Sequence, residues 1–137
     1  MEAKRMKQVW LLLVVGFAAA SSTLGPTVSA ASSLDGVWSG SGEVNPKDGE
    51  RETVRCRVQY KRESEKVFGV TATCATRSRK IQQTGKVLKA TASTYVGDFY
   101  NQSYDVSGRV RVVLQGSTQT VTFQSARGTG SVSLRKQ

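Results

Sequence analysis

The spacing of Cys56 and Cys74, the two cysteines of the sequence, indicates a structural disulfide. From Val54 to Tyr60 every second residue is apolar, and the same alternation returns from Phe68 to Cys74. Such alternation is typical of half-buried strands. When the chain is folded about Glu65, the two runs pair in phase and Cys56 lies opposite Cys74, within reach of a disulfide. We predict this cross-strand disulfide over a redox pair, which lacks CxxC spacing, and over a metal site, which lacks histidine.

The sequence lacks the residues that most catalytic and metal sites require. It contains no histidine, which is the commonest general base and the commonest metal ligand. Serine and threonine have no such base to activate them, and no glycine-rich phosphate loop follows a strand and opens a helix. Acidic residues collect in expected turns, at positions 48, 50, 52, 63 and 65. We therefore expect no catalytic residue, no metal, no cofactor and no enzymatic activity.

The N-terminal segment has the order of a secretory signal peptide. Three basic residues near the start precede an apolar run from Val9 to Ala20, and small residues lead to Ala30. The apolar run is too short to span a membrane, and no later run is as apolar. We predict a signal peptide over 1–30, with an earlier alternative cleavage site at 18–20, and a single domain over 31–137. The expected location is secreted or periplasmic, without a transmembrane segment, where a disulfide persists.

The alternation of apolar and polar residues continues along the chain and predicts an all-β domain. Folding the chain at successive clusters of turn residues keeps the apolar positions of neighbouring runs on one face. This gives eight short strands without a helical pattern, which is typical of an antiparallel up-and-down barrel. A small β-sandwich is the alternative, but it more often requires longer crossing connections. The expected turns lie at 45–50, near 65, near 78, near 91, at 101–102, at 116–117 and at 127–128.

The register also predicts which charges face solvent. Arg55 and Arg57 lie on the outward phase of one strand, and Arg109 and Arg111 on that of a strand across the barrel. The leader carries three basic residues and one acid, so its removal lowers the net charge from +10 to +8. The basic residues ring the barrel and are not interleaved with stacking aromatics, so we expect no specific nucleic-acid partner. A solvated surface is the default expectation, and weak attraction to an anionic envelope component or an acidic protein is the more specific alternative.

The first and last strands of the predicted barrel resemble the calycin arrangement of lipocalins, avidins and bacterial metalloprotease inhibitors. The motif GVW, ending at Trp38, opens the first strand, and the motif SLRK over 133–136 ends the last strand. The resemblance implies that Trp38 closes one end of the barrel. It also implies that Arg135 packs over this ring as a cation on an aromatic face.

We expect the domain to act as a monomeric, non-enzymatic protein-binding module, with a protease inhibitor as the concrete case. The predicted mature N-terminus is similar to the Ser-Ser-Leu start of the inhibitors, whose N-terminal arm enters the protease cleft. This arm consists of Ala31, Ser32, Ser33 and Leu34. The next candidates for partner binding are the basic turn residues Arg77, Arg79 and Lys80.

The alternative function is a carrier of a small apolar ligand inside the barrel. Glycines at the inward positions 40, 42, 85, 97 and 108 would leave space, and they would also let the strands bend. Tyr60, Gln83, Tyr95 and Tyr104 would supply polar groups. However, an eight-stranded barrel has little spare volume, so we expect side chains to fill the interior. An internal cavity would favour the carrier, and an exposed apolar rim would favour the binding module.

Overall fold

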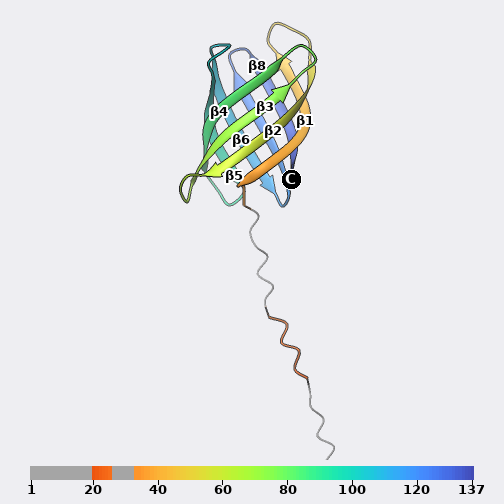
Figure 1. Ribbon diagram of the computed structural model, residues 1–137, viewed down its shortest axis with the longest axis vertical. Coiled ribbons are helices and arrows are strands. Elements are labelled where there is room, and N and C mark those ends of the chain that lie inside the picture. Colours follow the sequence, from red (N-terminus) through yellow and green to blue (C-terminus); the bar gives the residue numbers. More distant parts are fainter. Residues whose placement is uncertain (1–19, 26–32) are drawn as a thin grey trace, which may run out of the picture.

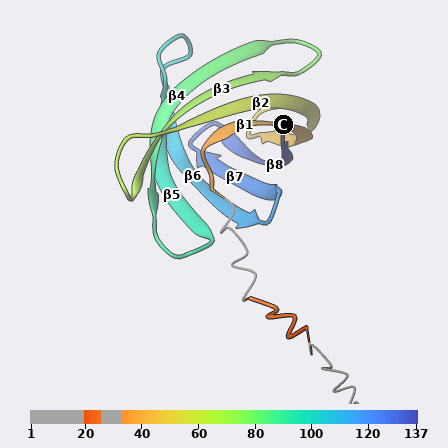
Figure 2. The ribbon, with the colours of Figure 1, turned by 60° about the horizontal axis from the view of Figure 1, so that its bottom comes forward.

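The computed structural model describes residues 20–25 and 33–137, and the second range forms a closed β-barrel (Figure 1). Figure 2 shows the strands following one another around the barrel in chain order, with β8 beside β1. Every neighbouring pair is antiparallel, so the all-β up-and-down barrel is confirmed and the sandwich is not formed. The strands are β1 (Gly36–Pro46), β2 (Glu52–Arg62), β3 (Val67–Ala75), β4 (Lys80–Lys89), β5 (Thr94–Asn101), β6 (Val106–Gln115), β7 (Thr118–Ser125) and β8 (Gly128–Lys136).

The alternation in β2 produces a wall with one apolar and one polar face. Its inward residues from Val54 to Tyr60 are buried, while Arg55 and Arg57 between them are exposed. The same pattern leaves Arg109 and Arg111 exposed on β6. A slip of one residue would have inverted these side chains, so the predicted facing of all four arginines is confirmed.

The predicted pairing holds where the turn between two strands was identified correctly. β2 and β3 place Cys56 opposite Cys74, and the two sulfur atoms form the predicted disulfide. β6 and β7 place Val112 opposite Val121, on either side of a turn that contains Gly116 in the left-handed region (φ 61°). A two-residue glycine turn is a strong hairpin signal, and it fixes the register of both strands.

Three other pairings differ from the prediction because the turns have other lengths. β5 and β6 place Phe99 opposite Gly108, since the turn extends to Asp105, which has a positive φ of 48°. β4 and β5 place Val87 opposite position 97 instead of 95, and β7 and β8 place Val121 opposite position 132 instead of 134. Each shift is an even number of residues, so every inward residue stays inward.

Two glycines of β1 allow it to pass close to β8. A Cβ atom at Gly40 would overlap the carbonyl of Ser133, and a Cβ atom at Gly42 would overlap that of Ser131. Without side chains at these positions, β1 coils tightly enough to close the barrel. The prediction that inward glycines serve strand bending is confirmed here.

The two ends of the barrel differ in what covers them. We call the end that holds the start of β1 and the end of β8 the closed end. The opposite end, formed by the β1–β2, β3–β4, β5–β6 and β7–β8 turns, we call the mouth. The candidate site lies along the barrel axis between these two ends.

The predicted leader lies largely outside the described residues, as do the cleavage site after Ala30 and the arm residues Ala31 and Ser32. Within 20–25 and 33–137, no helix has the length and apolar character needed to cross a membrane. The disulfide indicates an environment outside the reducing cytoplasm.

Candidate functional site

The inward side chains change from buried to half-exposed between the closed end and the mouth. On β6, Val112 is buried, whereas Val106 and Val110 nearer the mouth are half-exposed. On β4, Val87 is buried, whereas Ile81 nearer the mouth is half-exposed. These residues face the interior, so solvent reaches them from inside the barrel.

A cavity of about 860 Å³ opens at the mouth and extends inward as far as Tyr60. This volume lies within the range of about 300–1,000 Å³ that is usual for small-molecule sites. The expectation of a filled interior is therefore wrong. Trp38 and Phe68 pack in the core toward the closed end, whereas Phe99 and Phe123 stand near the mouth with their ring centres 6.3 Å apart. The apolar lining includes Val70, Ala72, Ile81, Phe99, Val110 and Phe123.

The proposed polar groups of the interior do not all reach the cavity. Tyr60 and Gln83 line it, and Tyr104 lines a second hollow beside it. Tyr95 instead lies toward the closed end, where its ring packs edge-on against Phe68 with a centroid distance of 5.4 Å. Tyr60, at the inner end of the cavity, and Gln83, on its β4 wall, thus contact the cavity directly.

Residues before β1 plug the closed end. The side chain of Leu34 is fully buried, and its carbonyl accepts a hydrogen bond of 2.8 Å from the indole Nε1 of Trp38. Lys136 Nζ donates to the carbonyl of Ser33 at 3.0 Å. The prediction that Leu34 belongs to an exposed arm is wrong, because this side chain is part of the core.

Trp38 closes this end, but its cationic partner is not the predicted one. Lys136 Nζ lies 5.7 Å from the centre of the Trp38 ring. Arg135 lies opposite Ser39 on the outward phase and is exposed, whereas Lys136 lies opposite Trp38. Since side chains alternate between the two faces of a strand, Arg135 points away from the ring. The assignment of Arg135 to barrel closure is therefore wrong by one residue.

The floor of the cavity holds a buried polar pair. The Tyr60 hydroxyl donates a hydrogen bond of 2.6 Å to Gln119 Oε1, and only 2% of Gln119 is exposed. Burial raises the pKa of the Tyr60 hydroxyl well above its usual range. The amide nitrogen Nε2 of Gln119 has no partner among the described residues. The pair thus joins β2 to the non-adjacent β7 at the base of the cavity.

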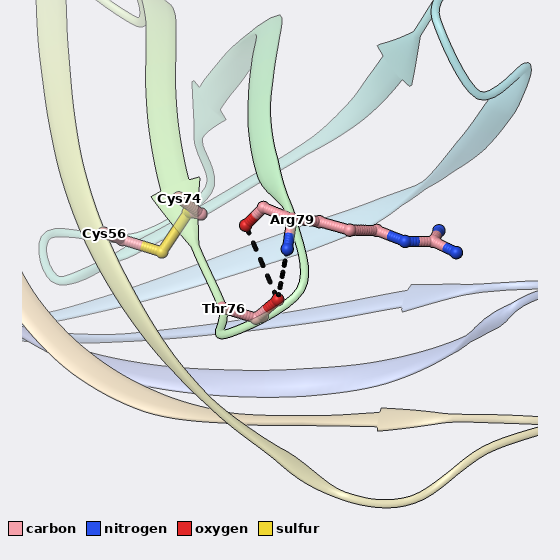
Figure 3. Close-up of a disulfide and its surroundings, with 4 residues drawn as sticks. All are labelled: Cys56, Cys74, Thr76 and Arg79. Carbon is pink, nitrogen blue, oxygen red and sulfur yellow. Dashed lines mark hydrogen bonds between the residues drawn. A yellow bond between two sulfur atoms is a disulfide. The ribbon is translucent and has the colours of Figure 1, made fainter.

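The disulfide and the adjoining turn form one wall of the mouth (Figure 3). Thr76 Oγ1 accepts a hydrogen bond of 3.1 Å from the backbone nitrogen of Arg79, and the backbone nitrogen of Thr76 donates to the Arg79 carbonyl at 2.8 Å. These bonds fix the β3–β4 turn directly after Cys74. Figure 3 shows the Arg79 side chain extending out of the turn that Thr76 closes.

Basic side chains border the cavity on two turns of the mouth. Arg77 and Arg79 lie on the β3–β4 turn, Arg127 lies on the β7–β8 turn, and all three line the cavity. Lys80, the remaining predicted candidate of this cluster, is exposed at the start of β4 but does not line the cavity. The structure thus brings two of the predicted basic residues together with Arg127, which the sequence did not single out.

Three residues at the site were not predicted from the sequence, for different reasons. Lys136 was passed over because the resemblance pointed to Arg135, although the inward phase of Leu134 already placed Arg135 outward and Lys136 inward. Arg127 was taken as a turn residue, and only the closure of the barrel brings its turn to the same opening as Arg79. Gln119 is on the inward phase of β7, so its polar character at an apolar position was a detectable signal.

No protein-family model matches the chain, and no curated protein is significantly similar to it in sequence. Several solved structures share its fold. A redesigned β-barrel, mFAP1, bound to DFHBI has a TM-score of 0.63 and 16% identity, over 76% of this chain and 94% of that one. A second, mFAP0, also bound to DFHBI, has a TM-score of 0.63 and 17% identity, over 75% and 98% of the two chains. A de novo designed fluorescence-activating barrel has a TM-score of 0.59 and 15% identity, over 76% and 94%. At these identities the likeness concerns the barrel fold alone.

Proposed function

We propose that the barrel binds a small, largely apolar molecule in its interior, without catalysing a reaction. The observation that carries this proposal is the cavity of about 860 Å³, which is open at the mouth and lined by apolar side chains. Ligand sites are typically concave, mainly apolar and supplied with a few polar groups. Tyr60 and Gln83 would provide such groups here. Barrels of similar fold have been designed that bind DFHBI, which is compatible with a ligand in this position.

A matched pair of substitutions on β3 tests this proposal. Ala72 faces the cavity, whereas Ala75 lies on the same strand with its side chain exposed. In Ala72→Phe the new ring would occupy ligand space, and in Ala75→Phe it would lie in solvent. Binding of the neutral fluorescent probe N-phenyl-naphthylamine should weaken about tenfold or more in Ala72→Phe, a loss of about 1.4 kcal/mol, and stay unchanged in Ala75→Phe. Equal affinities in the two variants would contradict an interior site.

The structure supports the protein-binding hypothesis less well than the carrier. That hypothesis relied on a free arm from Ala31 to Leu34, similar to the arm of metalloprotease inhibitors. Of the two arm residues that the structure describes, Leu34 is buried and Ser33 is held through its carbonyl by Lys136. A stable complex with a secreted protease, in the absence of any bound small molecule, would restore this hypothesis.

We propose that the predicted leader directs export of the protein to an oxidising compartment and is then cleaved. The support for this is the Cys56–Cys74 disulfide, which persists outside the cytoplasm, together with the order of basic, apolar and small residues over 1–30. N-terminal sequencing of the protein from a secreting culture should begin at Ala31. Recovery of the intact chain from the cytoplasm would contradict export.

A further inference from the structure

The charge at the mouth is distributed unevenly between its turns. The β3–β4 and β7–β8 turns carry Arg77, Arg79 and Arg127 and no acidic residue. Among the residues that the structure describes, none of these arginines forms a salt bridge. The β1–β2 hairpin, which lies between these two turns, has mixed charge, with Lys47 and Arg51 beside Asp48, Glu50 and Glu52. Glu52 accepts a hydrogen bond of 3.0 Å from the Ser78 hydroxyl of the β3–β4 turn. The β3–β4 and β7–β8 turns thus carry positive charge without an acidic residue, and the β5–β6 turn lies between them on the side of the mouth opposite the β1–β2 hairpin.

Arg79 and Arg127 border a common hollow on that side. The hollow has a volume of about 170 Å³ and is also lined by Tyr104 and Asn101. It shares Arg79, Arg127, Ile81, Gln83 and Val106 with the lining of the main cavity, so the two spaces adjoin. A volume of this size holds several water molecules, and it can therefore accept a carboxylate or a phosphate group.

The position of Arg79 leaves its hydrogen-bond donors available. The centre of its guanidinium group lies 5.4 Å from the centre of the Tyr104 ring. An arginine that stacks on an aromatic face still presents its N–H groups at the edge of the guanidinium plane. The Asn101 side chain is already engaged, since it donates to the Gln82 carbonyl and accepts from the backbone nitrogen of Tyr104. The turn that carries Tyr104 is thereby fixed beneath Arg79.

We propose that the ligand is a single-chain amphiphile with an anionic head group. Its apolar chain lies in the main cavity, and its carboxylate or phosphate is bound between Arg79 and Arg127. Arginine recognises both groups through charge-assisted hydrogen bonds. From Val54 to Tyr60 the cavity is about 15 Å deep, taking about 3.3 Å per residue and a strand tilt of about 40°. This inference rests on the proposed function and adds the chemical class of the ligand.

Four decyl compounds that differ only in the head group test the proposal. Decanoate, decyl phosphate, decanol and decyltrimethylammonium are titrated below their micelle concentrations into protein expressed as the full chain with export. Competition with N-phenyl-naphthylamine reports their affinities. Both anions should bind about tenfold or more tightly than decanol, and the cation should bind most weakly, because a charge-assisted contact at an open site contributes about one decade. The ratio of decanoate to decyl phosphate distinguishes a fatty acid from a phosphorylated lipid.

Two double variants with the same change in charge locate the head group. Arg79→Gln/Arg127→Gln should reduce the affinity for both anions to that for decanol and leave decanol binding unchanged. Arg55→Gln/Arg57→Gln, on the outer face of β2, should preserve the preference for anions. Equal binding of the four compounds would overturn the head-group proposal while the cavity proposal stands. Equal loss of anion preference in both double variants would show a general charge effect and overturn the assigned site. Failure of all four compounds and of the probe to bind would overturn both proposals.

Discussion

The hydrogen bond between Tyr60 and Gln119 is the residue-scale feature that best connects stability with the cavity. Both side chains are buried, and one amide hydrogen-bonding group of Gln119 already lacks a partner among the described residues. A buried polar group that loses its partner keeps the full cost of its desolvation. The floor of the cavity is thus sensitive to the loss of a single oxygen atom.

Tyr60→Phe should lower the free energy of unfolding by about 1–3 kcal/mol, because it leaves the Gln119 amide without its bond. Tyr60→Phe/Gln119→Leu should recover part of this loss, since it removes the unpaired amide as well. Urea unfolding of Tyr60→Phe, Gln119→Leu and the double variant measures the coupling energy between the two side chains. Unchanged stability in Tyr60→Phe would show that water replaces the hydroxyl at the floor.

The same pair predicts how stability changes in alkali. Burial holds the pKa of Tyr60 above its ordinary value of 10.0, so the folded protein keeps a proton that the unfolded chain releases. This contribution is fully present below pH 10.0 and is lost as the pH rises toward the folded pKa. The stability difference between wild type and Tyr60→Phe should therefore shrink above pH 10.0. A difference that stays constant through this range would contradict the raised pKa.

At the scale of elements, the segment before β1 acts as the lid of the closed end. The side chain of its Leu34 is fully buried, and the side chains of Trp38 and Lys136 both donate hydrogen bonds to its backbone carbonyls. Leu34→Ala should lower the free energy of unfolding by about 2–5 kcal/mol, the range for a buried leucine. Ser33→Ala, an exposed neighbour, should change it by less than about 0.5 kcal/mol. Thermal unfolding of both variants decides whether this segment is a plug or a free arm.

The disulfide connects β2 and β3 beside the cavity across a sequence separation of 18 residues. Replacing both Cys56 and Cys74 by serine should lower the free energy of unfolding by about 3 kcal/mol, because the unfolded chain loses a closed loop. Denaturant unfolding measures this loss, and circular dichroism should show the same β-structure. A much smaller loss would mean that the unfolded chain already brings these strands together.

The fold was predictable from the sequence to a different degree in each element. The alternation of apolar and polar residues determines which residues face inward. This assignment stays correct when the predicted pairing of two strands is shifted by an even number of residues. The β5–β6 turn was misjudged because its length depends on the positive φ of Asp105 and on side-chain bonds of Asn101. Arg135 was preferred to Lys136 because a motif indicates a residue type but does not determine its face.

At the scale of the whole molecule, the cavity could not be predicted because it depends on the sum of all side chains around the barrel. Each strand contributes inward residues of known size, but their distribution along the axis follows from the stagger of eight strands. Trp38 and Phe68 are buried toward the closed end, whereas Ala72 and the glycines of neighbouring strands leave space nearer the mouth. Closure of the barrel also brings the β3–β4 and β7–β8 turns to the same opening, where Arg79 and Arg127 border one hollow.

The outer surface offers an alternative place for an apolar ligand. Leu88 and Val96 lie opposite each other on β4 and β5, and both are exposed. A small molecule that adheres to this pair would mimic binding without entering the barrel. The interior and the exterior are distinguished by which methyl groups lie near the bound molecule.

If the interior of the barrel is the ligand site, nuclear Overhauser effects should connect bound decanoate with methyl groups inside the barrel. We expect contacts from the alkyl chain to Val70, Ala72 and Val110, which line the cavity. Contacts confined to the exposed Leu88 and Val96, with none to the cavity residues, would contradict it.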